Sequence, residues 1–302
     1  MRKFLIYLSL VMAMVLFSFS FVWYKQVYVY YTPLITMFFR LLISSLFLFL
    51  YAITLKKFKK VDKKDYKAFL LLALFEPLIY FIGESFGMNL VSATVGSVII
   101  STIPIFTPVL AFYMFKERLS KTNIFGIILS FFGVLLVVLK DDFSFSASPG
   151  GVLLMFLAVA GAMGYSVQII KLTKRYNSMT IITVQNAIGA VYFLPLLLIF
   201  DFHQLENIHI SWQSLLPLFE LAIFSSTFAY IFFLFGVRNL GITTANMFTN
   251  IIPVFTAIFA FFVLDESLIV RKIIGIAVVV TGLFLSQIKN NKFIKRYFFL
   301  RK

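Results

Sequence analysis

Residues 103–134, IPIFTPVLAFYMFKERLSKTNIFGIILSFFGV, recur as residues 252–283, IPVFTAIFAFFVLDESLIVRKIIGIAVVVTGL, at a shift of 149 positions and without a gap. Chance similarity between hydrophobic helices supplies leucine, isoleucine and phenylalanine matches, but it does not readily align a proline, a glutamate and two glycines at one offset. The chain therefore consists of two related halves. The matched pairs are Pro104 and Pro253, Thr107 and Thr256, Glu117 and Glu266, Gly126 and Gly275, and Gly133 and Gly282.

The composition is that of a membrane protein. Of 302 residues, 61% are hydrophobic and only 13% are charged, whereas roughly a quarter are charged in soluble domains. A helix needs about 20 apolar residues to cross a hydrocarbon core of about 30 Å. Charged or turn-rich breaks divide the chain into ten such spans, so we expect an all-α integral membrane protein with ten transmembrane helices. The spans are 4–24, 33–55, 68–87, 94–115, 122–139, 150–170, 179–200, 212–235, 244–264 and 272–288.

The basic residues set the expected orientation. The net charge is +15, but the lysines and arginines lie in short loops, so they do not indicate a nucleic-acid partner. With the N-terminus in the cytoplasm, 22 of the 27 basic residues fall on the inner side. We therefore predict a multi-pass protein of the inner membrane with both termini in the cytoplasm and a basic cytoplasmic tail at 289–302. The first span is too long for a signal peptide and is read as a retained helix.

The repeat and the topology together predict an inverted architecture. Five spans per half is an odd number, so the second half, 150–288, enters the membrane upside down relative to the first, 1–139. Glu117 is then expected at the cytoplasmic face and Glu266 at the outer face, and the outer loop 140–149 joins the halves. Inverted repeats of this kind let secondary transporters alternate between two related states, each open to one side. Channel and intramembrane-enzyme functions rank below a carrier.

Several chemistries have no support in the residues. The chain contains no cysteine, and its two histidines, His203 and His209, share one predicted outer loop, so we expect no metal site and no cofactor. No H-E-x-x-H motif suggests a metalloprotease, and no phosphate-binding loop suggests ATP hydrolysis. The expected partners are a small-molecule cargo of unknown identity and the lipid bilayer, with coupling to protons or to exchange of cargo.

The chain resembles the drug/metabolite transporter superfamily and its EamA-type ten-helix members. The resemblance rests on STIPIFTPVLAFYMFKERLSKTNIFGIILSFFGVLL and TNIIPVFTAIFAFFVLDESLIVRKIIGIAVVVTGLFL, with FSFSFVWYKQV in the first span and FFRLLISS in the second. It implies a basket-like bundle around a central cavity, with the fifth and tenth helices outermost. It also implies export or exchange of small metabolites or drugs by alternating access.

Four ionisable residues fall inside predicted spans: Arg40, Glu76, Glu84 and Glu220. A charge at a helix centre costs about 2.5–3.5 kcal/mol on insertion scales, so each calls for an explanation. Arg40 and Glu84 lie at similar depths near the outer side and could pair, either at a cargo site or as a structural ion pair.

Glu76 lies near the middle of its span and precedes Pro77, which removes a helix hydrogen bond and favours a kink. Burial would favour its protonated form, which suits a proton or cargo site; the alternative is a permanently protonated core carboxyl. Glu220, in LFELAIFSSTFAY, echoes the LFEP of Glu76 in the other half, with a five-residue difference in length.

Uncharged polar residues complete the candidate site. Gln185, Asn186, Asn246 and Asn250 could bind cargo, or they could form hydrogen bonds between helices. Pro104 and Pro253 are candidate hinges for alternating access or static kinks.

Other recurring residues are interpreted as structural. The small hydroxyl residues 225–227 and the glycines that recur every seven residues are expected to allow close helix packing. An interfacial aromatic belt is expected from Trp23, Tyr24, Tyr28, Tyr30 and Tyr31.

Overall fold

The computed structural model describes residues 2–106, 120–139, 147–206, 208 and 210–286, and in these ranges the regular elements are helices. Glu117, His209, the tail 289–302 and most of the predicted joint 140–149 lie outside the described residues. The first half contains α1 (Arg2–Val27), α2 (Pro33–Thr54), η1 (Lys63–Asp65), α3 (Tyr66–Ala73), η2 (Leu74–Ile79), α4 (Tyr80–Leu90), α5 (Ala93–Ile100) and α7 (Lys121–Val138). The second half contains α8 (Pro149–Thr173), α9 (Ser178–Phe200), α10 (Phe202–Glu206), α11 (Trp212–Glu220), η3 (Leu221–Ala229), α12 (Tyr230–Leu240), α13 (Ile242–Met247), η4 (Phe248–Ile251), α14 (Ile252–Leu264) and α15 (Val270–Ser286).

Eight helical stretches in the described ranges are long and apolar enough to cross a membrane. The apolar helix Ala93–Phe106 is shorter in its described part, and α15 has 17 residues. Large apolar side chains face outward over the bundle, among them Leu153, Ile199 and Phe262, each more than 70% exposed. Lipid is the solvent that such a surface requires, so the prediction of an all-α, multi-pass membrane protein is confirmed. The count of ten spans stays a prediction.

Polar residues at the helix starts define where several spans begin. Thr32 accepts a hydrogen bond from the Ile35 amide, and Pro33 occupies the first turn of α2. Asn177 caps α9 in the same way through the Thr180 amide, at 2.8 Å. Such caps satisfy amides that have no partner within their own helix.

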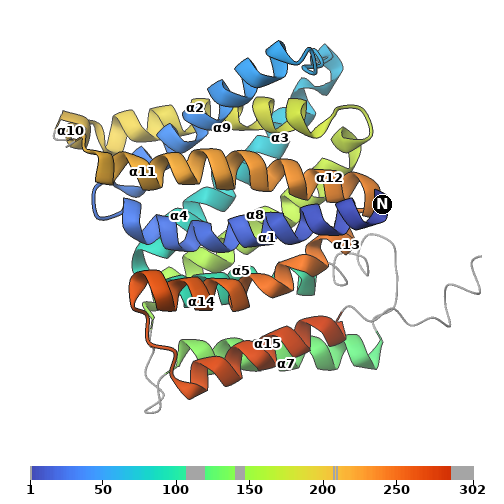
Figure 1. Cartoon of the computed structure of the whole chain (residues 1–302), viewed down its shortest axis with the longest axis vertical. Coiled ribbons are helices and arrows are strands. Elements are labelled where there is room, and N and C mark those ends of the chain that lie inside the picture. Colours follow the sequence, from blue (N-terminus) through green and yellow to red (C-terminus); the bar gives the residue numbers. More distant parts are fainter. Residues whose placement is uncertain (1, 107–119, 140–146, 207, 209, 287–302) are drawn as a thin grey trace, which may run out of the picture.

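The helices form stacked layers along the longest axis of the molecule (Figure 1). The pair α7 and α15 lies at one end of this axis, and α2, α3 and α9 lie at the other. Between them are α1, α4, α5, α8, α12 and α14. Helices of different halves pack against each other throughout, with α2 on α9, α4 on α8, and α1 on both α12 and α14. The two halves therefore form one intertwined bundle.

The loops that follow α2 and α8 meet at one end of the bundle. The Lys59 ammonium donates to the Arg175 carbonyl at 2.8 Å, and the Tyr176 hydroxyl donates to the Asp65 carboxylate at 2.7 Å. Arg175 also forms an ion pair with Asp65 at 2.5 Å. The sequence places both loops on one side of the membrane, which agrees with these contacts.

The outlying pair α7 and α15 packs backbone against backbone. A Cβ atom on Gly126 would lie 2.3 Å from the Ser286 amide nitrogen, and one on Gly282 would lie 2.4 Å from that of Ser130. Gly133 and Gly275 make a similar approach further along, where a Cβ on Gly133 would lie 2.9 Å from the Gly275 carbonyl oxygen. The interpretation of these four glycines as packing residues is confirmed, and the order of their contacts makes α7 and α15 antiparallel.

Candidate functional site

Each half carries a π-helical segment within one of its long helices, at overlapping positions of the repeat, and the segment of the first half is kinked. The first segment is η2, where Glu76 has extended backbone angles (φ −147°, ψ 113°) and Pro77 follows. The second is η3, and both segments are wide π-type turns. At the shift of 149 positions, Glu76 corresponds to Ser225. At this shift η2 falls within the longer segment η3, so the gap-free register places Ser225, and not Glu220, opposite Glu76. The echo between Glu76 and Glu220 stays a sequence prediction.

Glycines of the second half make room for the kink at Glu76. On α8, a Cβ at Gly161 would lie 2.8 Å from the Tyr80 amide nitrogen, and one at Gly164 would overlap the Phe75 ring at 2.2 Å. On α9, a Cβ at Gly189 would lie 2.2 Å from the Pro77 ring. The kink of one half is thus seated in a groove that only glycines of the other half can form.

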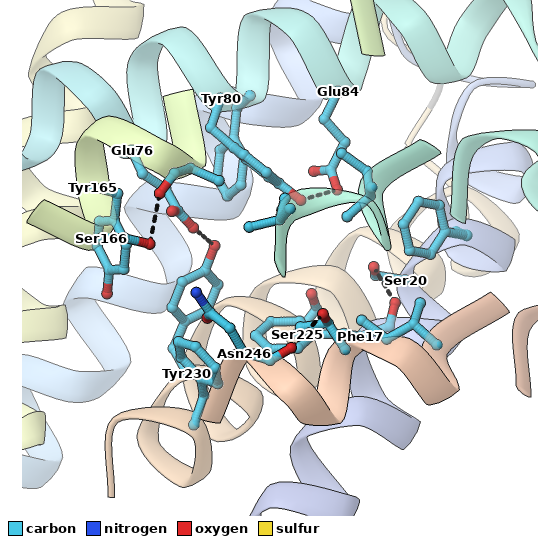
Figure 2. Close-up of a pocket in the computed structure, with 18 of the residues that line it drawn as sticks. Phe17, Ser20, Glu76, Tyr80, Glu84, Tyr165, Ser166, Ser225, Tyr230 and Asn246 are labelled. Atoms are coloured by element: carbon cyan, nitrogen blue, oxygen red, sulfur yellow. Dashed lines mark hydrogen bonds between the residues drawn. The ribbon is translucent and has the colours of Figure 1, made fainter. Parts of the chain in front are cut away.

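A pocket opens beside this kink, in the centre of the bundle (Figure 2). Both halves line it, and it contains four of the predicted site residues: Arg40, Glu76, Glu84 and Asn246. Its wall is otherwise mostly aromatic, from Phe17, Phe21, Tyr80, Phe81, Tyr165, Tyr230 and Phe233.

Glu76 projects into the pocket from η2 and is 6% exposed. Its Oε1 accepts a hydrogen bond from the hydroxyl of Tyr230, which lies on α12 of the other half (Figure 2). Its Oε2 accepts no hydrogen bond from any residue that the structure describes. One oxygen of this buried carboxyl therefore faces the pocket without a protein partner.

Arg40 and Glu84 are joined through Tyr24 and form no direct ion pair among the described residues. The Tyr24 hydroxyl donates to Glu84 Oε2 at 2.6 Å and accepts a hydrogen bond from Arg40 Nη1. The second Glu84 oxygen accepts from Tyr80 at 2.9 Å. The expected proximity of Arg40 and Glu84 is thus present, but a neutral hydroxyl lies between the charges.

Other Arg40 donors reach the serines of η3. Arg40 Nη2 donates to Ser225 Oγ at 3.0 Å, and Nε donates to Ser226 Oγ. Thr227 shares a 2.7 Å hydrogen bond with Ser44 of α2. These hydroxyl groups were expected only to allow close packing, so that interpretation is incomplete. The two π-helical segments therefore contribute different groups to the pocket. The segment η2 contributes the Glu76 carboxyl, and η3 contributes the serine hydroxyls that accept hydrogen bonds from Arg40.

Four predicted site residues lie outside the pocket. Asn186 is buried and donates to Ser44 Oγ at 2.8 Å. It therefore forms a hydrogen bond between two helices, which was the alternative to cargo binding. Gln185 and Asn250 are also buried, at 1% and 0% exposed, and neither lines the pocket. Glu220 is partly exposed at the end of α11.

Two polar groups in the pocket have no hydrogen-bond partner among the residues that the structure describes. The hydroxyl of Tyr165 is buried and forms no hydrogen bond with any described residue, although the ring is only 3% exposed. It lies close enough to Glu76 for an electrostatic interaction. The side chain of Asn246 also lines the pocket, and no hydrogen bond joins it to another described residue. Buried polar groups are nearly always paired, so these groups suggest a bound partner.

Both candidate hinge prolines begin a helix after a break. Pro253 lies in the first turn of α14, directly after the tighter helix η4. Pro104 follows the turn at residues 101–102, after α5 ends. At such positions a proline interrupts no hydrogen bond of the new helix. The role of Pro104 and Pro253 as hinges stays a prediction.

The expected aromatic belt is wrong for three of its five members. Tyr24, Trp23 and Tyr31 are 0%, 8% and 5% exposed. Tyr24 belongs to the buried network, and Tyr31 donates to Ser214 Oγ of α11 at 2.8 Å. The sequence analysis also did not predict that Tyr80, Tyr165 and Tyr230 line the pocket. A tyrosine within an apolar span carries no periodic signal that separates a lipid-facing ring from one whose hydroxyl reaches a buried carboxyl.

At the α5 end of the bundle, Glu266 ties the second half to the first. Its carboxylate accepts from the Ala93 amide at 2.7 Å, from the Thr94 hydroxyl at 2.7 Å and from the Thr94 amide at 3.3 Å. A carboxylate at the N-terminus of a helix satisfies free amides and complements the helix dipole. Lys25, at the end of α1, interacts electrostatically with Glu266 and donates to the Met88 carbonyl at 2.6 Å.

Comparisons with known proteins agree with this architecture. The sequence profile of the EamA-like transporter family matches the chain twice, at residues 4–139 and 149–287. An uncharacterized transporter of Archaeoglobus fulgidus is 25% identical over 289 residues, which cover 95% of this chain and 98% of that protein. The uncharacterized transporter YdfC of Bacillus subtilis is 28% identical over 87% of this chain and 84% of its own length. A solved crystal structure superposes with a TM-score of 0.67 over 93% of this chain and 97% of its own, at 14% identity, which shows a shared fold.

The fold and the pocket define a multi-pass membrane protein with a buried polar site between two halves. The chain belongs to the EamA-like transporter family of the drug/metabolite transporter superfamily and is a membrane transporter.

Proposed function

We propose that the protein is a secondary transporter that exports or exchanges small molecules by alternating access, with the central pocket as its cargo site. The observation that carries the proposal is the pocket itself. It is buried, it is formed by both halves beside their π-helical segments, and it contains Glu76, Glu84 and Arg40. Ionisable groups at this depth are costly in a membrane protein and usually mark a transport path.

The contacts between the halves support an inverted repeat of ten helices. Gly126 packs against Gly282, and Gly133 packs against Gly275. The shift of 149 positions converts the first pair into the second, as expected if a two-fold axis relates α7 to α15. The packing of α4 on α8 has its counterpart in the packing of α12 on α1. We propose two five-helix repeats, 1–139 and 150–288, in the inner membrane with both termini in the cytoplasm.

Alternating access requires that the pocket be closed on one side of the membrane at a time. The hydrogen bonds of Glu266 to the start of α5 are a candidate for the contact that closes one side. The charge pattern puts this end of the bundle on the outer side. There the loop after α14 joins α5 of the other half through the three hydrogen bonds of Glu266. In the proposed cycle these bonds break when the pocket opens outward. Glu76, beside the kink, then exchanges cargo or a proton with the solution on that side.

An accessibility experiment tests the proposal without knowledge of the cargo. The chain has no cysteine, so a single Ser20→Cys substitution gives the pocket one thiol. A membrane-impermeant maleimide is applied to spheroplasts and to inverted membrane vesicles. We expect labelling from both sides and no steady ion conductance in planar bilayers. Labelling from neither side would overturn the assignment of the pocket, and a steady conductance would indicate a channel.

A further inference from the structure

We propose that the pocket selects a small organic cation, a protonated amine attached to an apolar or aromatic group. The inference deepens the proposed function and rests on it, because it names the class of cargo for the same pocket. It follows from which charged groups in the pocket are already bound to the protein and which are not.

The positive charge of the pocket is largely compensated within the protein. Arg40 uses Nε, Nη1 and Nη2 to donate to Ser226, Tyr24 and Ser225. Its guanidinium carbon also lies 4.4 Å from the centroid of the Phe81 ring and 5.3 Å from that of Tyr24. These contacts compensate the arginine within the protein. A cargo carboxylate would have to share the guanidinium with these contacts through its two remaining N–H groups.

The negative charge is only partly engaged. Both oxygens of Glu84 accept hydrogen bonds, from Tyr24 and from Tyr80. Glu76 has one such bond, from Tyr230, and its second oxygen accepts none from the described chain. The open electrostatic position in the pocket is therefore beside the Glu76 carboxyl, and a cationic cargo would stabilise the ionised form of this group through a charge-assisted hydrogen bond.

The groups around Glu76 suit the rest of such a cargo. Tyr165, whose hydroxyl has no partner among the described residues, lines the same pocket and adds a polar group to it. The rings of Phe17 and Tyr230 meet edge to face with centroids 5.1 Å apart, and Phe233 lies 6.2 Å from Phe17. Aromatic faces attract cations and accommodate apolar groups.

Anionic and zwitterionic cargoes fit less well. Arg40 is the basic residue among the described residues that line the pocket, and each of its three nitrogens already donates a hydrogen bond. An anion would also face the carboxyl groups of Glu76 and Glu84. A zwitterion would satisfy Glu76 with its ammonium group, but its carboxylate would face Glu84 and would have only the two remaining N–H groups of Arg40 as charged donors. We therefore expect discrimination in the order amine, zwitterion, anion.

Three probes of one shape test this order: 2-phenylethylamine, phenylalanine and 3-phenylpropionate. Their binding to the purified full-length protein in nanodiscs is measured by calorimetry at pH 7. We expect 2-phenylethylamine to bind at least about tenfold more tightly than either of the others, since a charge-assisted hydrogen bond is involved. Equal binding of all three, tighter binding of 3-phenylpropionate, or no binding of 2-phenylethylamine overturns the proposal.

Variants assign the selectivity to the pocket. Glu76→Gln should weaken amine binding by about tenfold or more, while Glu220→Gln, the same change outside the pocket, should not. Tyr165→Phe removes a hydroxyl without a protein partner, so it should weaken amine binding about threefold in a protein that still folds. Equal losses in the Glu76 and Glu220 variants would contradict the assignment. If maleimide labels the Ser20→Cys thiol from both sides of the membrane but no amine binds, the proposed cargo class is wrong while the proposed carrier function stands.

Discussion

The two halves meet in two very different ways, at the α7–α15 pair and around the central pocket. In the outlying pair, glycines bring two backbones together so closely that a single Cβ would overlap the opposite helix. In the pocket, charged and hydroxyl groups meet across the halves, and the Tyr165 hydroxyl has no described partner. Close packing has little tolerance for movement, whereas hydrogen bonds can exchange partners. In the proposed cycle we therefore expect α7 and α15 to stay joined while the pocket rearranges.

The largest expected effect comes from removing the buried charge of Arg40. Arg40→Met leaves Glu84 without its compensating charge and should destabilise the protein by about 3–5 kcal/mol. The thermal unfolding midpoint and the abundance in membranes are measured against Arg238→Met, which changes an exposed arginine. The double variant Arg40→Met with Glu84→Gln should recover part of the loss. Normal abundance together with lost transport would instead assign Arg40 to cargo binding.

The glycine-packed pair gives the next largest effect. Gly282→Ala places a Cβ 2.4 Å from the Ser130 amide nitrogen, so the helices must separate. We expect a loss of about 1–3 kcal/mol, which is typical of an overpacked interior. Gly150→Ala is the matched control, because its Cβ would meet only Ser148 Oγ at 3.7 Å. Similar unfolding midpoints for the two alanine variants would show that α7 and α15 are not tightly packed.

A smaller effect on stability, with a clear effect on access, is expected at Glu266. Glu266→Ala removes a carboxylate from the start of α5 and should cost about 1 kcal/mol. The substitution destabilises only the conformation that is closed on the outer side, so the conformation that is open to the outside becomes more populated. The Ser20→Cys thiol should then react about fivefold faster with maleimide applied from the outer side. Unchanged labelling from that side would mean that Glu266 does not control access to the pocket.

The smallest effect on stability distinguishes two tyrosines of the pocket. Tyr165→Phe removes a hydroxyl without a described partner and should change stability by less than about 0.5 kcal/mol. Tyr230→Phe removes the donor to Glu76 and should cost about 1–3 kcal/mol. Thermal unfolding of both variants in the same detergent provides the comparison. A large loss for Tyr165→Phe alone would show that its hydroxyl is part of the structural network.

The sequence predicts the helices well because lipid demands them. A backbone in a hydrocarbon core must satisfy its own hydrogen bonds, so long apolar stretches become helices almost without regard to their neighbours. The break at Glu76 was also predictable, because Pro77 cannot continue a helix. The overlapping π-helical segment η3 contains no proline, and the signal for it was the alignment of Glu76 with Ser225 at the repeat shift.

The side-chain network could not be predicted from local patterns. The position of Tyr24 between Arg40 and Glu84 depends on how α1, α2 and α4 pack together. Tyr24 and Glu84, which share a hydrogen bond, are 60 positions apart in the sequence. The tie between Glu266 and Thr94 joins residues 172 positions apart. The repeat singled out Glu266 through its match with Glu117 but gave no partner for it. The predicted depth in the membrane singled out Arg40, Glu76, Glu84 and Glu220 alike as candidate site residues. Only the tertiary structure shows that the first three line the pocket and that Glu220 does not.

The most direct test of the central claim compares cells that express the wild-type protein, Glu76→Gln and Glu220→Gln at equal membrane abundance. Small molecules are measured inside the cells and in the medium. We predict that wild type and Glu220→Gln lower the same intracellular compounds and raise them in the medium, and that Glu76→Gln does neither. Identical profiles for wild type and Glu76→Gln would contradict a cargo site at Glu76.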